Sequence, residues 1–410
     1  MNFFRLMLLF ITCLPTCSAY TGLSMQEIPV KTLSAEIVPH SLLISPDAKR
    51  MAWFIHGNEN GKKTVQLVLD GKPGPSYDDA ISSDKSVNCL CFSPDSRRVA
   101  YIAQRDQRWI PIVDGIEGTP REEIWDLQFS KNSKHTLYRV WDNEKVFFVY
   151  DEKLYQHLER YREVILSGDG RRVGYTGRLK RKFFAGFAGP GAKEYSGGFR
   201  VAFSPDSSKL AFAISSKKKE HVVLNGTPGK SYDYVDALSF SPNSKHFAYF
   251  ARSKTAAYMV LDGVEKPVKL KEVVQILFSP NSARTVLLSA TKTKDCLWVD
   301  GKVSKEYEGI ENITFSPNSR HIASIASRPA GSMILKDGVE GKLYSNIAQL
   351  SFSPDSKHVA YSAMHNGKWL VVQDGIESAP YDEVVDIRYT PTGSLQAYVI
   401  NKNQLVKLSR

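Results

Sequence analysis

One short pattern recurs along the whole chain and limits the folds that it can adopt. Phe-Ser-Pro-Asp/Asn-Ser occurs six times, and four weaker copies complete a series that starts at residues 44, 92, 129, 166, 203, 240, 278, 315, 352 and 389. From residue 92 onward the spacing is 37 residues, with a single step of 38, whereas the first step is 48. A fixed period of this length is typical of proteins built from one repeated supersecondary unit.

Each unit reads as four short antiparallel strands, and residues 352–388 serve as the example. A strand of alternating polarity ends at the start of each unit. Ser-Pro-Asp-Ser then favours a tight turn, because Pro and Asp fix or bridge the backbone, and a second strand follows at 358–362. A third strand at 369–372 ends in Asp-Gly, the strongest two-residue hairpin signal. A short fourth strand then carries a tyrosine, Tyr381.

Two positions of the second strand predict how the units pack. A small residue recurs there at Ala52, Ala100, Ala211, Ala248, Ala323, Ala360 and Ala397. The next position is aromatic at Trp53, Tyr101, Tyr138, Tyr175, Phe212, Tyr249, Tyr361 and Tyr398. We expect the small residue to let neighbouring sheets approach and the aromatic ring to fill the space between them. Since such a sheet cannot bury both faces alone, the pattern predicts an all-β fold, a β-propeller of four-stranded antiparallel blades.

The two ends of the chain indicate how the propeller closes. The last unit, 389–410, has room for only three strands, and the stretch 26–38 precedes the first unit. We therefore expect about ten repeats in a single ring, closed by the N-terminal strand. Propellers usually have four to eight blades, so two five-bladed rings are the alternative. No linker interrupts the period between the fifth and sixth units, which favours one ring.

The pattern Phe-Ser-Pro-Asp-Ser-Lys/Arg-x-hydrophobic-Ala-Tyr resembles the WD-like repeat of TolB-type propeller proteins, over about 365 residues. The resemblance implies an exported bacterial propeller. That family includes periplasmic proteins that interact within the cell envelope, and propeller domains attached to peptidases.

The first residues are typical of an export signal. Arg5 is the only charged side chain before Tyr20, an apolar run follows it, and Cys17-Ser18-Ala19 supplies small residues for cleavage. We expect residues 1–19 to be a signal peptide and 20–410 to be the propeller, in a periplasmic or secreted protein. Cleavage after Ala19 and lipid attachment at Cys17 both stay open. Of the cysteines beyond the signal, Cys89, Cys91 and Cys296, we expect buried, unreactive thiols.

The chain is basic, with a formal net charge of +11. For an exported protein this favours an acidic protein or an anionic envelope polymer as partner, and not nucleic acid. No segment after the signal is long and apolar enough to span a membrane, and we expect a monomer.

The loops between second and third strands carry most of the candidate binding residues. We predict a basic loop face formed by Arg105, Arg108, Arg178, Lys180, Arg181, Lys182, Lys217, Lys218, Lys219, Lys292 and Lys294. The crossings between units fall on the same face and carry acids such as Asp78 and Asp233, so that a face of mixed charge is expected. A merely solvated rim is the competing interpretation.

Signals for catalysis and metal binding are poor. The chain has no Gly-x-Ser-x-Gly elbow, no His-Glu-x-x-His and no phosphate-binding loop. His135, His246, His321 and His358 occupy equivalent positions, but equivalent residues on packed sheets lie on the order of 10 Å apart, too far to share a zinc ion. We expect no metal and no cofactor. The sequence favours a non-catalytic exported scaffold that mediates interaction with a protein or an envelope polysaccharide. The alternative is a propeller enzyme of the lyase or hydrolase type, with its site at the central channel.

Overall fold

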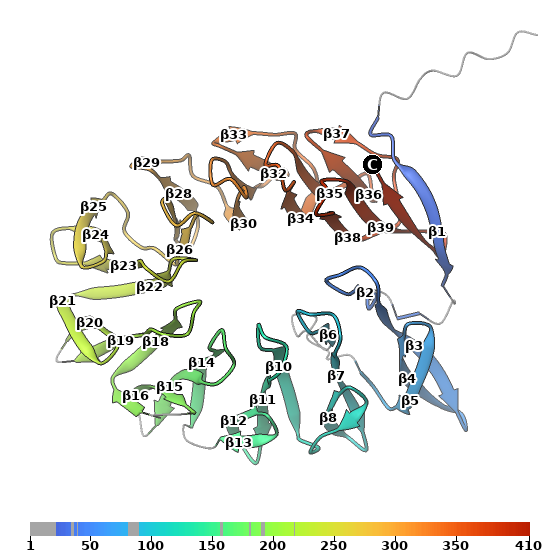
Figure 1. The fold of residues 1–410 in the computed structure, drawn as a ribbon, viewed down its shortest axis with the longest axis horizontal. Coiled ribbons are helices and arrows are strands. Elements are labelled where there is room, and N and C mark those ends of the chain that lie inside the picture. The colour runs from blue at the N-terminus through green and yellow to red at the C-terminus, as the bar shows by residue number, and fades with distance from the viewer. Residues whose placement is uncertain are drawn as a thin grey trace, which may run out of the picture.

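The protein is a ten-bladed β-propeller, and every blade is a four-stranded antiparallel sheet. The computed structural model describes residues 22–33, 37–38, 40–80, 90–155, 159–179, 182–189, 193–216 and 218–410, and all its regular elements are strands. Figure 1 shows the blades following one another around a ring in chain order, with the first strand of each blade toward the centre. The prediction of an all-β propeller of about ten repeats is confirmed.

The first five blades contain the following strands in order from the centre outward. They are β2 (Leu43–Ile44), β3 (Met51–Glu59), β4 (Lys62–Leu69) and β5 (Lys72–Tyr77); β6 (Leu90–Phe92), β7 (Val99–Arg105), β8 (Arg108–Val113) and β9 (Ile116–Glu117); β10 (Glu123–Phe129), β11 (Thr136–Asp142), β12 (Lys145–Tyr150) and β13 (Lys153–Tyr155); β14 (Arg160–Leu166), β15 (Val173–Leu179), β16 (Lys182–Ala188) and β17 (Lys193–Ser196); and β18 (Gly198–Phe203), β19 (Leu210–Ser216), β20 (Lys219–Leu224) and β21 (Thr227–Tyr232).

The remaining five blades follow the same plan, and the tenth combines both ends of the chain. They are β22 (Tyr234–Phe240), β23 (Phe247–Arg252), β24 (Ala257–Leu261) and β25 (Val264–Val268); β26 (Gln275–Phe278), β27 (Thr285–Ala290), β28 (Asp295–Val299) and β29 (Lys302–Val303); β30 (Gly309–Phe315), β31 (Ile322–Arg328), β32 (Gly331–Lys336) and β33 (Val339–Glu340); β34 (Asn346–Phe352), β35 (Val359–His365), β36 (Lys368–Gln373) and β37 (Ile376–Glu377); and β38 (Glu383–Tyr389), β39 (Leu395–Asn401), β40 (Gln404–Ser409) and β1 (Gln26–Thr32).

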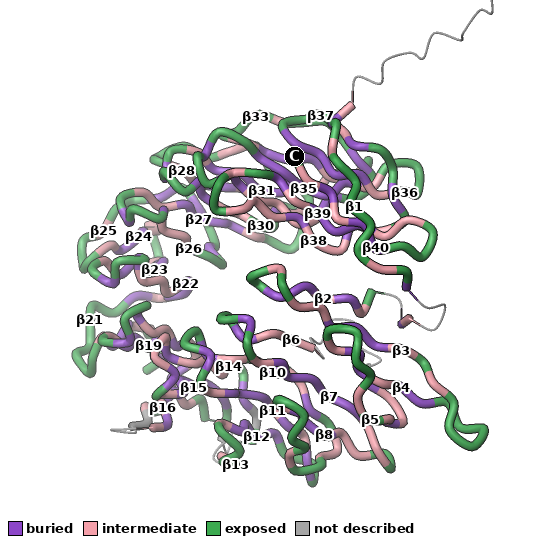
Figure 2. The backbone as a smooth tube through the Cα atoms, turned by 45° about the vertical axis from the view of Figure 1, so that its right-hand side comes forward, coloured by how far each residue is buried: buried purple, intermediate pink, exposed green. Residues whose placement is uncertain are grey.

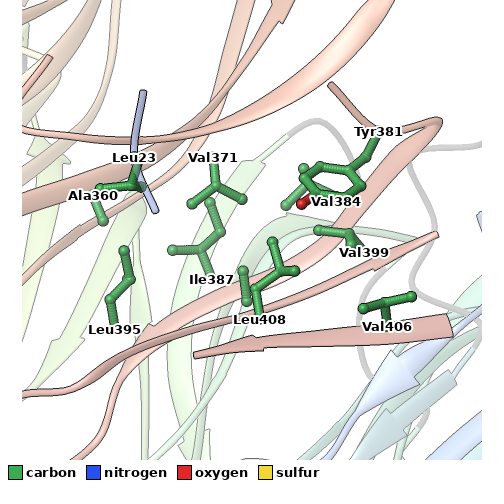
Figure 3. Packing of buried hydrophobic residues seen from close by; sticks show 11 residues of the cluster. Leu23, Ala360, Val371, Tyr381, Val384, Ile387, Leu395, Val399, Val406 and Leu408 are labelled. Atoms are coloured by element: carbon green, nitrogen blue, oxygen red, sulfur yellow. The ribbon is translucent and has the colours of Figure 1, made fainter. Parts of the chain in front are cut away.

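The N-terminal strand closes the ring, as the sequence predicts. β1 pairs antiparallel with β40, from Gln26 opposite Ser409 to Thr32 opposite Gln404, and Figure 1 shows blue β1 beside the red C-terminal strands. Just before β1, Leu23 packs in the cluster shared by the ninth and tenth blades (Figure 3). The alternative of two five-bladed rings is wrong, because the fifth and sixth blades share one core cluster and the tenth and first share another.

The hydrophobic core lies between the blades. The described residues form ten buried clusters, and each joins two neighbouring blades. The recurring small residues of the second strands, such as Ala52 and Ala360, are fully buried, and the aromatic residues after them are nearly so. Figure 2 shows burial along the middle of the strands and exposure at the turns. The predicted roles of both positions are confirmed.

The Ser-Pro-Asp/Asn-Ser turn joins strands within a blade and also joins blades. In the first blade the Ser45 hydroxyl donates to Asp47 and accepts the amide of Arg50, which closes the turn. At seven of the ten junctions, among the described residues, the backbone amide of the Asp or Asn donates to the last serine of the next turn at 2.9–3.2 Å, as Asp47 does to Ser96. The tenth blade reaches the first differently, because Arg388 donates to the carbonyls of Ser45 and Pro46.

The Asp-Gly turns are two-residue hairpins with both residues at positive φ, for example 51° at Asp70 and 84° at Gly71. This is the type I′ geometry that Asp-Gly favours. The aspartate also accepts the first amide of the second strand, as Asp70 does from Met51 at 3.0 Å. In seven blades of the described structure the residue at the aspartate position also pairs with the basic residue six positions after the unit start, as Asp70 does with Arg50. The Ser-Pro-Asp turns and the Asp-Gly turns therefore share one side of the ring, which we call the turn face.

A tyrosine–glutamate hydrogen bond connects five pairs of neighbouring blades. A tyrosine in or just after a fourth strand donates to a glutamate of the next fourth strand at 2.8–3.0 Å, in the pairs Tyr77–Glu117, Tyr232–Glu265, Tyr307–Glu340, Tyr344–Glu377 and Tyr381–Glu27. Contrary to the sequence prediction, Tyr381 lies beyond the two-residue fourth strand β37, where it forms an isolated bridge to Trp369. Where the tyrosine is replaced by Arg121 or Lys269, the next blade has Leu154 or Val303 at the glutamate position. The last pair ties the ninth blade to β1, so it also supports closure of the ring.

Removing one such hydroxyl tests this contribution to stability. Tyr344→Phe should lower the free energy of unfolding by about 1–2 kcal/mol, because the hydroxyl donates to a carboxylate at a buried junction. The measurement is urea or thermal unfolding followed by circular dichroism. Tyr398→Phe is the control, since this buried tyrosine forms no hydrogen bond among the described residues, and it should change stability little. Equal losses in the two variants would show that the bond contributes nothing specific.

The tyrosine–glutamate hydrogen bonds also predict that the stability of the fold decreases in acid. Hydrogen bonds from Tyr307 and Lys305 hold the pKa of Glu340 below its ordinary value. A depressed glutamate pKa stabilises the fold above the unfolded-state pKa of about 4.3 and loses that contribution as the pH falls through the folded-state pKa. Glu340→Gln should therefore be less stable than the parent protein at pH 7, and the difference should shrink by pH 3.

Unfolding by urea at pH 7, 5, 4 and 3 measures this difference. Glu306→Gln, at an exposed glutamate of the same blade junction, is the control. A stability difference for Glu340→Gln that does not change with pH would contradict the assignment.

Candidate functional site

The side of the ring opposite the turn face carries the loops between second and third strands and the crossings between blades. Contacts place both on one side, since Lys62 of the first such loop pairs with Asp78 of the following crossing at 2.6 Å. We call this side the loop face. Of the predicted binding residues, Lys180, Arg181 and Lys217 lie outside the described residues. The other eight all lie at or beside loops between second and third strands.

Three of these eight cations form ion pairs. Arg105 donates two hydrogen bonds to Glu117 at 2.8 Å, Arg108 contacts Asp142 at 3.1 Å, and Lys219 contacts Asp233 at 2.7 Å. The crossings supply some of the acids, as the sequence predicts for a face of mixed charge. These three residues offer less free positive charge to a partner than their side chains alone suggest.

Exposed cations without ion pairs gather on consecutive blades. Arg178 and Lys182 lie on the fourth blade, Lys218 on the fifth, and Lys292 and Lys294 on the seventh, and Lys254 fills the equivalent loop of the sixth. Within the described part of the chain, none of the six forms an ion pair. We call Arg178, Lys182, Lys218, Lys254, Lys292 and Lys294 the cationic arc.

A charge network joins the fourth, fifth and sixth blades beneath this arc. Arg200 in β18 contacts Glu163 of β14 at 2.5 Å and Asp236 of β22 at 2.6 Å, and Tyr234 donates to Asp236 at 2.9 Å. Arg252 lies over the ring of Tyr234 at 5.2 Å from its centroid. The network reaches the loop face, because Asp233, one residue before Tyr234, pairs with Lys219.

The titratable groups of this network are perturbed. Burial opposes ionisation of Asp236, but the hydrogen bonds from Arg200 and its charge keep the pKa of this carboxyl below its ordinary value. Burial raises the pKa of nearby Glu220, which accepts the backbone amide of Val235. Perturbed groups often mark functional sites, although ion-pair networks also produce them. The sequence did contain one signal for this network: of the residues three before each unit start, only Arg200 is an arginine.

The four histidines at equivalent turn positions contact residues of their own blade, and neither they nor the cysteines form a shared site among the described residues. Each of His135, His246, His321 and His358 has its Nδ1 atom at 2.5–2.7 Å from the aspartate of its own blade's third-to-fourth-strand turn. Among the described residues no three His, Cys, Asp or Glu side chains form a cluster that could hold a metal ion. Cys91 and Cys296, which the sequence predicts to be buried, are free thiols that are only partly buried. Burial raises the pKa of Cys91 to about 12 and also raises that of Cys296. Cys17 and Cys89 lie outside the described residues.

Comparison with known proteins finds similar solved structures but no similar sequence. No protein-family model matches the chain, and no curated protein matches it. The chain is similar to the structure titled "Crystal structure of the eukaryotic initiation factor", at 14% identity and a TM-score of 0.44, over 84% of this chain and 90% of that one. It is also similar to TolB from Acinetobacter baumannii (13% identity, 69% and 78% coverage, TM-score 0.29) and to the Dos1 propeller (10%, 94% and 94%, TM-score 0.36).

The Arg200 network can be tested by removing its centre. Arg200→Met leaves Asp236 and Glu163 without their cation, and should lower the free energy of unfolding by about 2–4 kcal/mol, the effect of breaking a largely buried ion pair. Adding Asp236→Asn to this variant should restore part of the loss. Lys62→Met, which breaks the exposed pair with Asp78, is the control and should cost about 1 kcal/mol or less. Urea unfolding measures all three, and similar losses for both single variants would contradict a special role for the network.

Proposed function

We propose that this propeller is a non-catalytic interaction scaffold that binds an acidic protein or an anionic envelope polymer through its loop face. The observation that carries the proposal is the cationic arc, in which four consecutive blades each present exposed cations without ion pairs. Elsewhere on the face, Lys62 and Lys368 pair with the carboxylates of Asp78 and Asp382. Exposed lysines without ion pairs also occur in the described loops between second and third strands of other blades, as at Lys63 and Lys402, but on average they are fewer per blade than in the arc. The positive field is therefore strongest on one side of the ring and favours a negatively charged partner there.

Two further features support a binding role. The Arg200 network connects the fourth, fifth and sixth blades, which carry four of the six cations of the arc. Its most buried acid, Asp236, is engaged by Arg200, which keeps the pKa of this carboxyl below its ordinary value, and a carboxylate held in its ionised form is poorly suited to act as a general acid.

The proposal also includes the location of the protein outside the cytoplasm. We propose that residues 1–19 direct the chain to the periplasm or the cell exterior, where envelope polymers supply anionic partners. The described residues contain no helix that is long and apolar enough to cross a membrane. The mass of the chain isolated from its native envelope distinguishes cleavage after Ala19 from lipid attachment at Cys17.

Charge reversal within the arc tests the binding face. The double variant Lys292→Glu/Lys294→Glu should elute from immobilised heparin and polyglutamate at lower salt than the parent protein. The control Lys63→Glu/Lys402→Glu makes the same change of net charge on the loop face of the first and tenth blades, at exposed lysines without ion pairs. It should elute closer to the parent protein, because screened charges act only over about 8–10 Å.

Equal shifts for the two double variants would mean that only net charge matters, and would contradict a localised face. Crosslinking in the native envelope, followed by mass spectrometry, then identifies the partner. Crosslinks that fall at Lys218, Lys254, Lys292 or Lys294 would support the arc as its contact surface, whereas crosslinks confined to the turn face would not.

A further inference from the structure

Two cavities open on the turn face at equivalent places in the ring. One, of about 600 Å³, lies between the fifth and sixth blades, and the other, of about 450 Å³, lies between the first and second. Both are lined by the third and fourth strands of one blade and by the second strand and the Asp-Gly turn of the next, including Gly263 in the first case and Gly115 in the second. Volumes of this size are common for small-molecule sites.

The same sequence builds both cavities. Pro-Gly-x-Ser-Tyr occurs at 73–77 and at 228–232, directly after the turns at Asp70 and Asn225. The fourth strands that carry it, β5 and β21, each have six residues, whereas β9, β29, β33 and β37 have two. In both blades the pairing of third and fourth strands shifts register beside the Pro-Gly pair. The longer strand and its irregular pairing form one wall of each cavity.

The floor of each cavity is apolar. Between the fifth and sixth blades it consists of Val222, Leu224, Phe247 and Tyr249. The equivalent residues between the first and second blades are Leu67, Leu69, Val99 and Tyr101. The aromatic rings belong to the packed junction, since Tyr249 lies against Phe247 at 5.8 Å between centroids. A ligand with an apolar body can therefore lie on a fixed surface in either cavity.

The rim of each cavity is cationic on both sides of the junction. Lys209 and Lys245 line the larger cavity, and Arg50, Lys72, Arg97 and Arg98 line the smaller one. Arg50 and Arg98 already pair with Asp70 and Asp114. In the described structure Lys72, Arg97, Lys209 and Lys245 form no ion pair, although Lys209 donates one hydrogen bond to the Ser244 carbonyl. Each blade junction thus places two unpaired cations above an apolar floor.

The acid at each rim is already engaged. Asp262 accepts the backbone amide of Phe247 at 2.8 Å and contacts His246, and Asp114 accepts the amide of Val99 at 3.0 Å and contacts Arg98. Neither carboxylate neutralises the unpaired cations opposite it. The charge that would complement either cavity is therefore negative.

We propose that the two cavities are equivalent binding sites for a small organic anion with an apolar body, such as an aryl or branched alkyl carboxylate, sulfonate or phosphate. The anionic group lies between Lys209 and Lys245 in one site and between Lys72 and Arg97 in the other, and the apolar body contacts the floor. The sites are on the face opposite the cationic arc, so this inference does not depend on the proposed function.

Titration with 1-anilinonaphthalene-8-sulfonate, an anion with an aryl body, tests the proposal by fluorescence and calorimetry. We expect two sites per native chain. Lys245→Glu should weaken one of them about tenfold or more, the effect of losing a charge-assisted hydrogen bond. Thr227→Trp fills the larger cavity from an exposed wall residue and should abolish the same site. Lys134→Glu makes the identical charge change at the equivalent turn position of the third blade, and should leave both sites unchanged.

Several outcomes would overturn the proposal. If Lys245→Glu and Lys134→Glu weakened dye binding equally, the effect would depend only on the net charge of the chain. A Thr227→Trp variant that still binds the dye at two sites, or dye binding that appears only with loss of circular dichroism, would place the dye elsewhere. Inorganic sulfate that competes at constant ionic strength with an affinity equal to that of the dye would show that the apolar floor plays no part. Retention on heparin should be the same in Thr227→Trp as in the parent protein, which separates this test from that of the loop face.

Discussion

The whole structure depends on contact between neighbouring blades. A four-stranded sheet of this length exposes two apolar faces, and each face becomes buried only when another blade packs against it. All ten buried clusters accordingly lie between blades. An open array would leave two faces uncovered, so the pairing of β1 with β40 completes the tenth blade and the packing of the tenth blade on the first buries the last pair of faces.

The repeat is preserved because its polar residues also act between blades. In Ser-Pro-Asp-Ser the first serine closes its own turn, and the last serine accepts the amide of the preceding blade. The first blade has Ala48 at the last position, and there Arg388 of the tenth blade supplies the contact instead. Hydrogen bonds in these turns and between the fourth strands therefore fix the spacing that the apolar clusters alone would leave adjustable.

The outer edges of the blades are protected against pairing with other chains. The longer outer strands carry proline, namely Pro29 in β1, Pro73 and Pro75 in β5, Pro228 in β21 and Pro267 in β25, whereas β9, β29, β33 and β37 have only two residues. Proline lacks an amide donor and short strands offer few, so both devices limit edge-to-edge association.

The sequence by itself determined the fold, since the period of 37 residues, the alternating strands, the Asp-Gly hairpins and the three-stranded last unit each have one local physical meaning. It also located the basic loops. It could not tell which cations stay unpaired, because Arg105 and Lys219 resemble Lys218 and Lys292 in the sequence. In the structure, Glu117 of β9 pairs with Arg105, and Asp233 of a crossing pairs with Lys219. The Arg200 network and the two cavities likewise join residues about 35 or more positions apart, from different blades. Such contacts depend on how blades pack side by side, so only the tertiary structure decided them.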